Sequence, residues 1–244
     1  MSPLLRSPHA KPVGTLCRWA IAISLALTSC VVSPQPSPPD PRPDLDGGGI
    51  GVLDQGTEDF GNLLTFEAAP GTVDPARGIV LVTNLDLDDA PSRVAVRSDG
   101  SFTIALAGLP GDTVRFQVDQ DGNRSEPADV EVDATGQVGT LVEDAPACLT
   151  FAPARYLPLA ASAAHSIVIR NDCSETVSLG APRLRRGLGP FTFSPTAPIQ
   201  IAAGDVAFIT VRSSGEADEH EDVLLVDVLA PVIARRAVTL TVPD

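Results

Sequence analysis

The chain has 244 residues, with 17 basic and 31 acidic side chains and a formal net charge of −14 at pH 7. So acidic a protein does not bind nucleic acid or an anionic membrane face by electrostatic attraction, and both partner classes are excluded. The length left after an N-terminal signal suits two small domains better than one.

The N-terminal segment has the pattern of a secretory signal. Arg6, Lys11 and Arg18 make a positive stretch with no acidic residue, and the apolar run WAIAISLALTSC follows at residues 19–30. This run is about a dozen residues long, whereas about twenty are needed to span a bilayer. It therefore fits the apolar region of a signal peptide, and residues 1–29 are left out of the fold.

The end of this run, Leu27-Thr28-Ser29-Cys30, resembles the lipobox of bacterial lipoprotein signal peptides. The resemblance implies cleavage before Cys30 and fatty acyl chains, such as palmitate, that anchor this residue in the lipid bilayer. Stable anchoring needs more than one chain, and a lipoprotein N-terminus carries several. Val31 is not the Asp that retains many lipoproteins in the inner membrane, so the resemblance points to the outer membrane. The alternatives are an ordinary signal peptide cleaved elsewhere or a buried helix.

The mature chain keeps 14 basic and all 31 acidic residues, a net charge of −17, and has no Lys, Met or Trp. This charge is unevenly divided. Residues 46–145 hold 19 acidic and 5 basic side chains, and residues 146–244 hold 10 and 8. Nearly all of the negative field therefore belongs to the first predicted domain.

Residues 30–61 are predicted to be the lipidated Cys and a disordered Pro/Gly-rich linker. Its prolines are Pro34, Pro36, Pro38, Pro39, Pro41 and Pro43. They favour extended polyproline II, and about fifteen such residues at about 3.1 Å each hold the first domain about 45 Å from the lipid. Three glycines at 47–49 predict a hinge after the stiff part. A PxxP ligand for a partner is the alternative to a plain spacer.

Residues 62–145 are predicted to form a β-sandwich. Apolar and polar residues alternate with a period of two in several short segments, as at residues 93–97, 101–106 and 113–118. Turn sequences bound them, among them Asp99-Gly100 and the hairpin sequence at residues 121–123. Short strands at such spacing favour a sandwich.

Within this stretch, three motifs resemble bacterial immunoglobulin-like domains of exported proteins. They are Asp99-Gly100-Ser101-Phe102, Gly111-Asp112-Thr113-Val114 and Asp121-Gly122-Asn123-Arg124-Ser125. The resemblance covers residues 70–133 and rests mostly on turn sequences. It implies a spacer or adhesive module and specifies a fold better than it specifies a ligand.

Residues 146–244 are predicted to form a second sandwich. The runs at 206–211 and 223–229 are almost continuously apolar, which is typical of central strands. Four motifs resemble the Hydin-type immunoglobulin-like domain: CLTF at 148–151, IVIRND at 167–172, GPFTFS at 189–194 and IAAGD at 201–205. The chain departs from that family at Asp172-Cys173, where a small polar turn is usual.

Cys148 and Cys173 remain once Cys17 is removed with the signal and Cys30 carries the lipid. In an exported chain such a pair indicates a disulfide, which for a loop of about 25 residues stabilises the fold by about 3 kcal/mol. The strands near both Cys are expected to be adjacent and antiparallel. A zinc site is the alternative, but His165 and His220 are solitary and lack metal-ligand spacing. No metal or other cofactor is predicted.

Three loops are acidic, at residues 86–89, 119–123 and 216–222. In the second, Gly122 is fourth counting from Asp119, whereas an EF-hand needs Gly at the sixth position and Glu at the twelfth. Solvated turns are the favoured interpretation, with a calcium-stiffened sandwich as the alternative. Residues 216–222 are predicted to be an exposed hairpin tip. A metal site that uses His220 is the alternative.

Arg183, Arg185, Arg186 and Tyr156 are the candidate contacts for a protein partner. Arginine forks suit carboxylate or phosphate groups, and protein hot spots favour Arg and Tyr. The Arg cluster therefore either docks an acidic surface, which could be the first domain itself, or consists of ordinary exposed charges.

No Ser or Cys with a convergent His and acid stands out as a catalytic set. His165 opens a predicted strand, and no nucleophile-elbow glycines flank a Ser. The sequence thus favours a non-catalytic cell-envelope lipoprotein that binds or scaffolds other envelope or surface proteins. A structural spacer subunit of a larger envelope complex is the alternative, and an enzyme ranks third.

Overall fold

The computed structural model describes residues 42–55, 63–133, 139–141, 145–214 and 220–242. Cys30, the signal segment and most of the Pro-rich tether lie outside these ranges, so the predictions about them stay predictions. Residues Asp40–Asp244 form one compact unit. Among the described residues, no helix has the length and apolarity needed to cross a bilayer.

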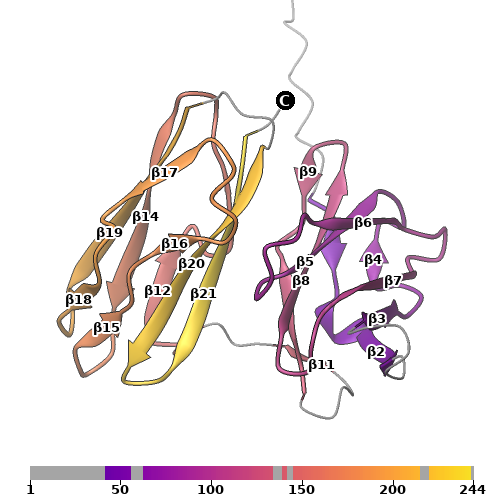
Figure 1. The fold of residues 1–244 in the computed structure, drawn as a ribbon, viewed down its shortest axis with the longest axis horizontal. Helices are drawn as coiled ribbons and strands as arrows, with labels where there is room; N and C mark the ends of the chain where they lie inside the picture. The colour runs from indigo at the N-terminus through magenta and orange to yellow at the C-terminus, as the bar shows by residue number, and fades with distance from the viewer. Residues whose placement is uncertain (1–41, 56–62, 134–138, 142–144, 215–219, 243–244) are drawn as a thin grey trace, which may run out of the picture. The chain divides into compact units, whose positions relative to one another are not determined.

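The chain is all-β, as predicted, and its strands form two β-sandwiches (Figure 1). One sheet of the first sandwich has the order β11-β10-β8-β5-β6, with β9 added beside β8. These strands are β5 (Ile79–Asn84), β6 (Ser92–Ala95), β8 (Thr113–Gln120), β9 (Asn123–Arg124), β10 (Ala128–Val132) and β11 (Gly139–Leu141). The facing sheet has the order β2-β3-β7, with β2 (Ile50–Gln55), β3 (Leu63–Ala68) and β7 (Phe102–Ala107). All of these pairs are antiparallel.

The core of the first sandwich lies between these two sheets. Its centre is a group of three aromatic rings. The rings of Phe66 and Phe116 pack edge to face with their centroids 5.1 Å apart, and the centroid of the Phe102 ring lies 6.0 Å from that of Phe116. The alternating residues of β7 and β8 supply the surrounding aliphatic side chains. The period-two pattern of the sequence therefore marks the inward faces correctly.

The second sandwich also has two sheets. One has the order β12-β14-β19-β17, with β12 (Leu149–Ala152), β14 (Ala164–Asn171), β17 (Phe191–Ser194) and β19 (Val206–Ser213). The other has the order β13-β21-β20-β15-β18, with β16 beside β20. Its strands are β13 (Tyr156–Pro158), β15 (Val177–Leu179), β16 (Arg183–Leu184), β18 (Ile199–Ile201), β20 (Glu221–Ala230) and β21 (Ala234–Thr241). Strand β13 runs parallel to β21, and the other pairs are antiparallel.

The predicted disulfide between Cys148 and Cys173 is confirmed. It joins the start of β12 to the end of β14, with the two Cα atoms 4.9 Å apart. Leu149 pairs with Asn171 in the antiparallel ladder of these strands. The backbone N–H of Asp172 donates to the carbonyl of Cys148 at 2.8 Å. The cystine thus links two antiparallel strands that backbone hydrogen bonds already pair.

The end of the predicted linker belongs to the first sandwich instead. Strand β2, within the range assigned to the linker, pairs with β3, and Ile50 is buried in the core. Strand β1 (Asp44–Leu45) pairs with β4 (Val73–Asp74). Residues Gly47–Gly49 form a 3-10 turn capped by the Asp46 carboxylate, and a Cβ at Gly49 would lie 2.5 Å from Thr72 Oγ1. Gly49 therefore allows close packing, and the three glycines form an ordered turn in place of the predicted hinge.

The two nearly continuous apolar runs have different surroundings. Both β19 and β20 are central strands, as predicted. Strand β19 exposes one face, where Phe208 is 56% exposed. Strand β20 is buried on both faces from Asp222 to Val226. The outer face of β20 is covered by the first sandwich, and that contact forms the site described next.

Candidate functional site: the interface between the sandwiches

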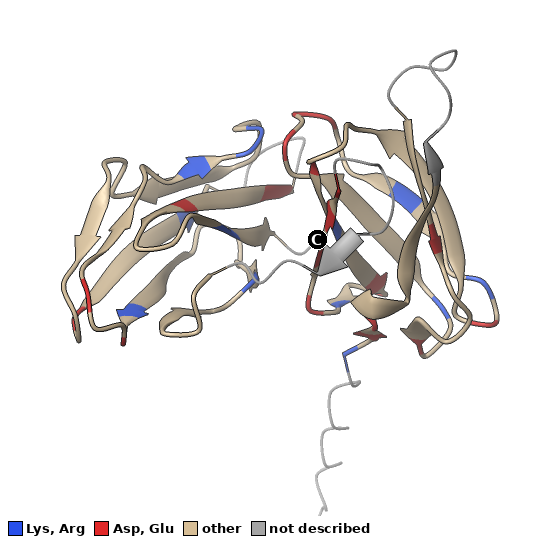
Figure 2. Cartoon of the chain, turned by 90° about the horizontal axis from the view of Figure 1, so that it is seen from below, with Lys and Arg blue, Asp and Glu red and all other residues tan. Residues whose placement is uncertain are grey.

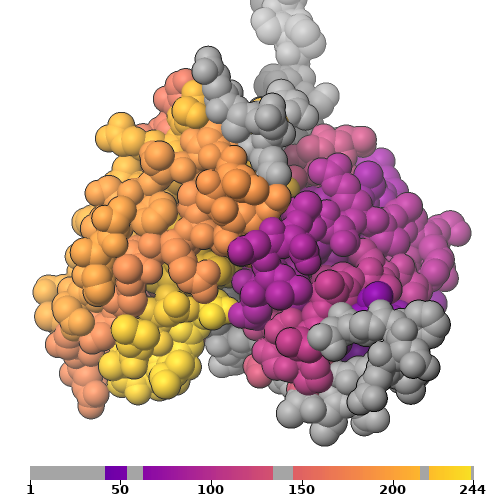
Figure 3. Space-filling view, viewed as in Figure 1, coloured from indigo at the N-terminus to yellow at the C-terminus, as the bar shows by residue number. Residues whose placement is uncertain are grey.

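The two sandwiches meet through a small apolar cluster. Leu85 of the first sandwich packs with Val223, Leu225 and Ala237 of the second, and each side chain is at most 2% exposed. Along β20 these residues alternate with Leu224 and others that fill the second core. One strand thus supplies two apolar surfaces, which explains why its sequence does not alternate. We call the contact between the two sandwiches the interface (Figure 3).

A buried ion pair lies beside the apolar cluster. Arg115 of β8 and Asp129 of β10 are register partners, and the guanidinium donates twice to the carboxylate, each time at 2.7 Å. The same guanidinium crosses the interface and donates to the carbonyl of Ala237 at 2.8 Å and to Thr239 Oγ1 at 3.0 Å. Both charged side chains are at most 3% exposed. Pairing and full hydrogen bonding are what a buried charge requires.

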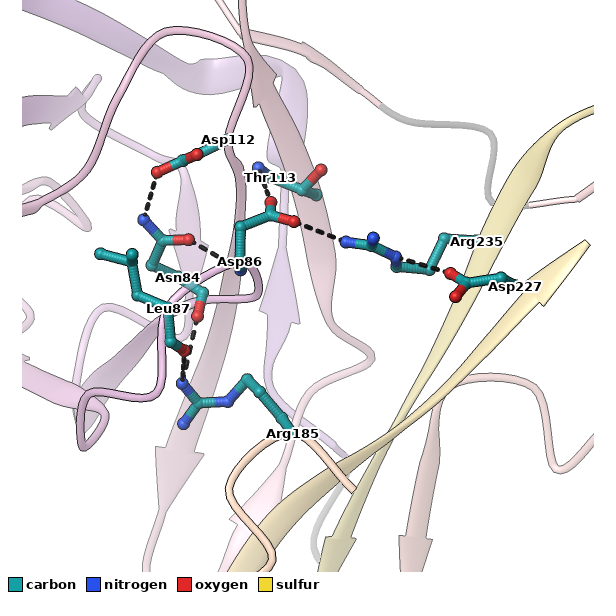
Figure 4. A network of polar contacts seen from close by, with 8 residues as sticks. All are labelled: Asn84, Asp86, Leu87, Asp112, Thr113, Arg185, Asp227 and Arg235. Carbon is teal, nitrogen blue, oxygen red and sulfur yellow. Dashed lines mark hydrogen bonds and ion pairs between the residues drawn. The ribbon is translucent and has the colours of Figure 1, made fainter. Parts of the chain in front are cut away.

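Arg185 of the second sandwich donates hydrogen bonds to the first sandwich at its acidic loop, residues 86–89, and beside it (Figure 4). Its guanidinium donates to three backbone carbonyls, those of Asn84, Leu87 and Asp89. Burial lowers the pKa of Arg185, although the nearby Asp222 carboxylate acts in the opposite direction. Arg185 is therefore held by backbone dipoles, and not by an ion pair with a loop carboxylate.

The neighbouring Arg186 takes part in the same contact, because its Nε donates to the carbonyl of Asp88 at 3.1 Å. Of the two alternatives open from the sequence, the structure places Arg185 and Arg186 on the acidic loop of the first domain. Arg183 lies on β16 and is exposed. The three arginines predicted as one contact set therefore lie in two places: Arg185 and Arg186 lie in the interface, and Arg183 is exposed to solvent.

Arg235 links the sandwiches through two carboxylates. Its Nη1 donates to Asp86 of the first sandwich at 2.6 Å, and its Nε donates to Asp227 of the second at 2.9 Å (Figure 4). Burial alone would lower the pKa of Arg235, but the hydrogen bonds to Asp86 and Asp227 outweigh it and the pKa is raised. Asp86 also accepts the backbone N–H of Thr113 at 2.8 Å. The loop at 86–89 keeps Asp86, Asp88 and Asp89 exposed, as expected of a solvated turn, and it also contacts the second sandwich.

The interface opposes charges of different sign. Acidic segments are concentrated where the sandwiches meet (Figure 2), and Arg185, Arg186 and Arg235 of the second sandwich contact the first. Arg236 faces elsewhere, with its guanidinium 5.1 Å from the centre of the Phe151 ring. Of the contacts made by Arg185, Arg186 and Arg235, the one between Arg235 and Asp86 is an ion pair, whereas Arg185 and Arg186 donate to backbone carbonyls.

A polar cavity of about 900 Å³ opens at one end of the interface. Its lining comes from both sandwiches: Ala90, Pro91, Arg93, Asp119, Asp121, Gly122, Arg124, Tyr156, Arg186, His220, Glu221, Thr241 and Val242. Tyr156, predicted as a partner contact, lies here and accepts a hydrogen bond from Thr241 Oγ1 at 3.2 Å. His220 also lines the cavity, whereas its neighbours at 215–219 lie outside the described residues.

Arg124, which lines this cavity, forms ion pairs with two carboxylates. Its Nε lies 3.3 Å from Asp119, and its Nη1 lies 2.8 Å from Glu221 across the interface. The second contact is an ion pair by distance but is poorly aligned, since Nη1 has no acceptor in hydrogen-bonding geometry. Asp119, considered above as a calcium ligand, is therefore engaged by an arginine.

Sequence reasoning missed Arg115 and Asp129. Both lie on the polar side of alternating strands, which suggested exposure to solvent. The available signal was their neighbourhood: Arg115 and Asp129 occupy the same face of two adjacent strands, and the apolar run at 223–229 requires cover on both faces. Together these features indicate a polar face docked on a second domain.

No protein-family model matches the chain, and no curated protein matches it in sequence. Solved structures give weak likenesses of fold. WR4, an MSP family member of C. elegans, is 9% identical over 40% of this chain and all of its own, with a TM-score of 0.34. The E. coli chaperone DraB is 12% identical over 39% of this chain and 54% of its own, with a TM-score of 0.33. The Vibrio cholerae protease VesB is 13% identical over 70% and 63%, with a TM-score of 0.32. At this level the likenesses say nothing about function.

Proposed function

We propose that this chain is a non-catalytic cell-envelope lipoprotein that presents two joined immunoglobulin-like sandwiches as one binding or scaffolding body. The observation that carries the proposal is the interface. It joins the sandwiches through an apolar cluster, a buried ion pair and arginine contacts to backbone carbonyls. A body that is already ordered loses less conformational entropy when it binds a partner.

The proposed location comes from the sequence. The lipobox resemblance at residues 27–30 supports an acylated Cys30, and the Pro-rich segment that follows supports a tether to the membrane. The resemblance of residues 70–133 to bacterial immunoglobulin-like domains supports a spacer or adhesive module. The outer membrane is the proposed site, with the sandwiches on either its periplasmic or its outer side.

The anchor is tested first. Mass spectrometry of the purified protein is expected to show an acylated N-terminus at Cys30, and the Cys30→Ser variant is expected in the soluble fraction. Protease digestion of intact cells, compared with lysed cells, then locates the sandwiches. Digestion on intact cells directs the search to surface partners, and protection until lysis directs it to periplasmic complexes. An N-terminus at another residue would overturn the lipoprotein assignment.

Partner binding is tested with photoreactive side chains in intact cells. Suitable positions are Ile233, 87% exposed in the β20–β21 hairpin, and Phe208 on the open face of β19. A binding role predicts a discrete crosslinked protein at one of these positions, with no such product at Glu175, exposed between β14 and β15. The absence of a crosslinked protein at both Ile233 and Phe208 would contradict a partner on these two surfaces.

A further inference from the structure

The polar cavity has the size and construction of a ligand site. Its volume of about 900 Å³ falls within the range of about 300–1,000 Å³ that is typical of small-molecule sites. Its walls belong to both sandwiches, with Arg93 and Asp121 from the first and Tyr156 from the second. Sites of this kind occur preferentially where domains meet.

Two unpaired charges of opposite sign face this cavity. Within the described part of the chain, neither Arg93 on β6 nor Asp121 in the β8–β9 turn has a hydrogen bond or ion pair from its side chain. Both residues also line an adjoining cavity of about 280 Å³, beside Gly78, Ile79 and Leu81. A free cation and a free carboxylate therefore lie near each other, outside the 4 Å of an ion pair.

The remaining charges restrict what can bind. Arg124 pairs with Asp119 and Glu221, and Arg186 donates to the carbonyl of Asp88. The lining holds three Arg against three carboxylates, so its formal charge is zero with His220 neutral. The carboxylates of the lining repel a purely anionic ligand, and the arginines repel a purely cationic one. A ligand that carries both charges can place each of them beside the opposite charge of the lining.

We propose that the cavity binds a zwitterionic ligand, with its carboxylate on Arg93 and its ammonium group on Asp121. The arginine fork suits a carboxylate. Tyr156 accepts its hydrogen bond from Thr241 and keeps its own hydroxyl proton to donate to the ligand. The ligand is a free amino acid or oligopeptide, or a protein segment with Lys near Asp or Glu. The site follows from the cavity alone and does not depend on the proposed envelope role.

Isothermal titration calorimetry on the chain from residue 30 tests the site. The probes are capped peptides in which one Lys and one Glu are separated by zero to three Gly, and the matched controls carry Gln at both positions, Lys at both or Glu at both. The Lys–Glu peptides are expected to bind and the controls are not. Free lysine, free glutamate and the uncapped Lys-Glu dipeptide distinguish a small metabolite from a protein segment.

Variants assign the two charges. Arg93→Gln and Asp121→Asn are each expected to weaken binding about tenfold, the usual effect of losing one charged hydrogen bond. Both should fold normally, because Arg93 is exposed and Asn tolerates the positive φ of 54° at position 121. Arg212→Gln and Glu175→Gln, exposed on the second sandwich and outside the cavity lining, are the matched controls.

Two results would overturn the proposal. One is the absence of binding for every zwitterionic probe, free or capped. The other is binding that Arg93→Gln and Asp121→Asn leave at the level of the two control variants. Neither result bears on the anchor or on the crosslinking experiment, so the two proposals fail separately.

Discussion

Arg115 and Asp129 form a closed ion pair inside the first sandwich, yet the same guanidinium is hydrogen-bonded to Ala237 and Thr239 of the second. A single side chain therefore takes part in both the first sheet and the interface. Because the pair is at most 3% exposed, neither charge can turn to water when the other is removed.

Asp129→Ala is expected to destabilise the protein by about 3–5 kcal/mol, because it leaves the Arg115 charge buried without its partner. Urea unfolding at neutral pH measures the loss. The control is Arg42→Ala at the exposed pair with Glu126, where both side chains are about 60% exposed and the expected cost is below about 1 kcal/mol. Equal effects at the two pairs would show that Arg115 is not held as described.

The joint replacement of Arg115 by Met and Asp129 by Leu is expected to preserve folding, because a well-packed apolar pair often replaces a buried ion pair without loss. It also removes the hydrogen bonds to Ala237 and Thr239. Hydrogen exchange is expected to rise on the outer face of β21, while the core amides of β3 and β14 keep their protection. Unchanged exchange at β21 would contradict a role for Arg115 across the interface.

Two adjacent leucines on β20 face opposite sides of the strand: Leu225 lies in the interface, and Leu224 lies in the core of the second sandwich. Leu225→Ala and Leu224→Ala are each expected to cost about 2–5 kcal/mol. Leu225 packs against Leu85, so combining Leu225→Ala with Leu85→Ala should be non-additive by about 0.5–3 kcal/mol. The same cycle with Leu224 should be additive, because Leu224 faces the other core. Urea unfolding of the single and double variants gives both cycles.

Replacing Cys148 and Cys173 together by Ser is expected to cost about 3 kcal/mol, the value for opening a loop of about 25 residues. Chemical denaturation of the oxidised protein and the double variant measures this difference. The loss should be seen first in amides of β12 and β14, which the cystine joins. A difference below about 1 kcal/mol would mean that the strand pairing alone restricts this loop.

The carboxyl group of Asp99 reports on the turn before β7. Hydrogen bonds from the side chain and the backbone of Ser101 lower its pKa from the ordinary value of 3.8. A lowered pKa favours the folded state above the ordinary value, and this contribution is lost as the pH falls through the folded value. Ser101→Ala is expected to raise the Asp99 pKa, measured by carboxyl NMR titration.

The alternation of apolar residues predicted both sandwiches, because each strand that faces a core shows it in a period of two. The same pattern could not show that a polar face is covered. Arg115 and Gln117 alternate with core residues and are each 2% exposed, since the second sandwich and neighbouring backbone cover that face. The segment at 50–55 was missed because three glycines before it suggested a hinge, whereas they form a 3-10 turn in which Gly49 packs closely against Thr72.

The candidate site was predicted in part. Arg185, Arg186 and Tyr156 were selected for their side-chain chemistry, and the structure places all three where the sandwiches meet or in the cavity. Their surroundings could not be predicted, because Arg185 binds backbone carbonyls, which no sequence pattern marks. Arg93 and Asp121 gave no signal as a pair, since they come together only through the pairing of β5 with β6 and β8.

The division of the cavity wall between two sandwiches has a thermodynamic consequence. Arg93 and Asp121 stand on one side and Tyr156 and Glu221 on the other, so the complete wall exists only while the sandwiches are docked. Any molecule that binds the complete wall must stabilise the docked state by the same free energy that docking adds to its affinity. Occupancy of the cavity would then be measurable at a distance, as slower exchange of the amides around Ala237, which the ligand never touches.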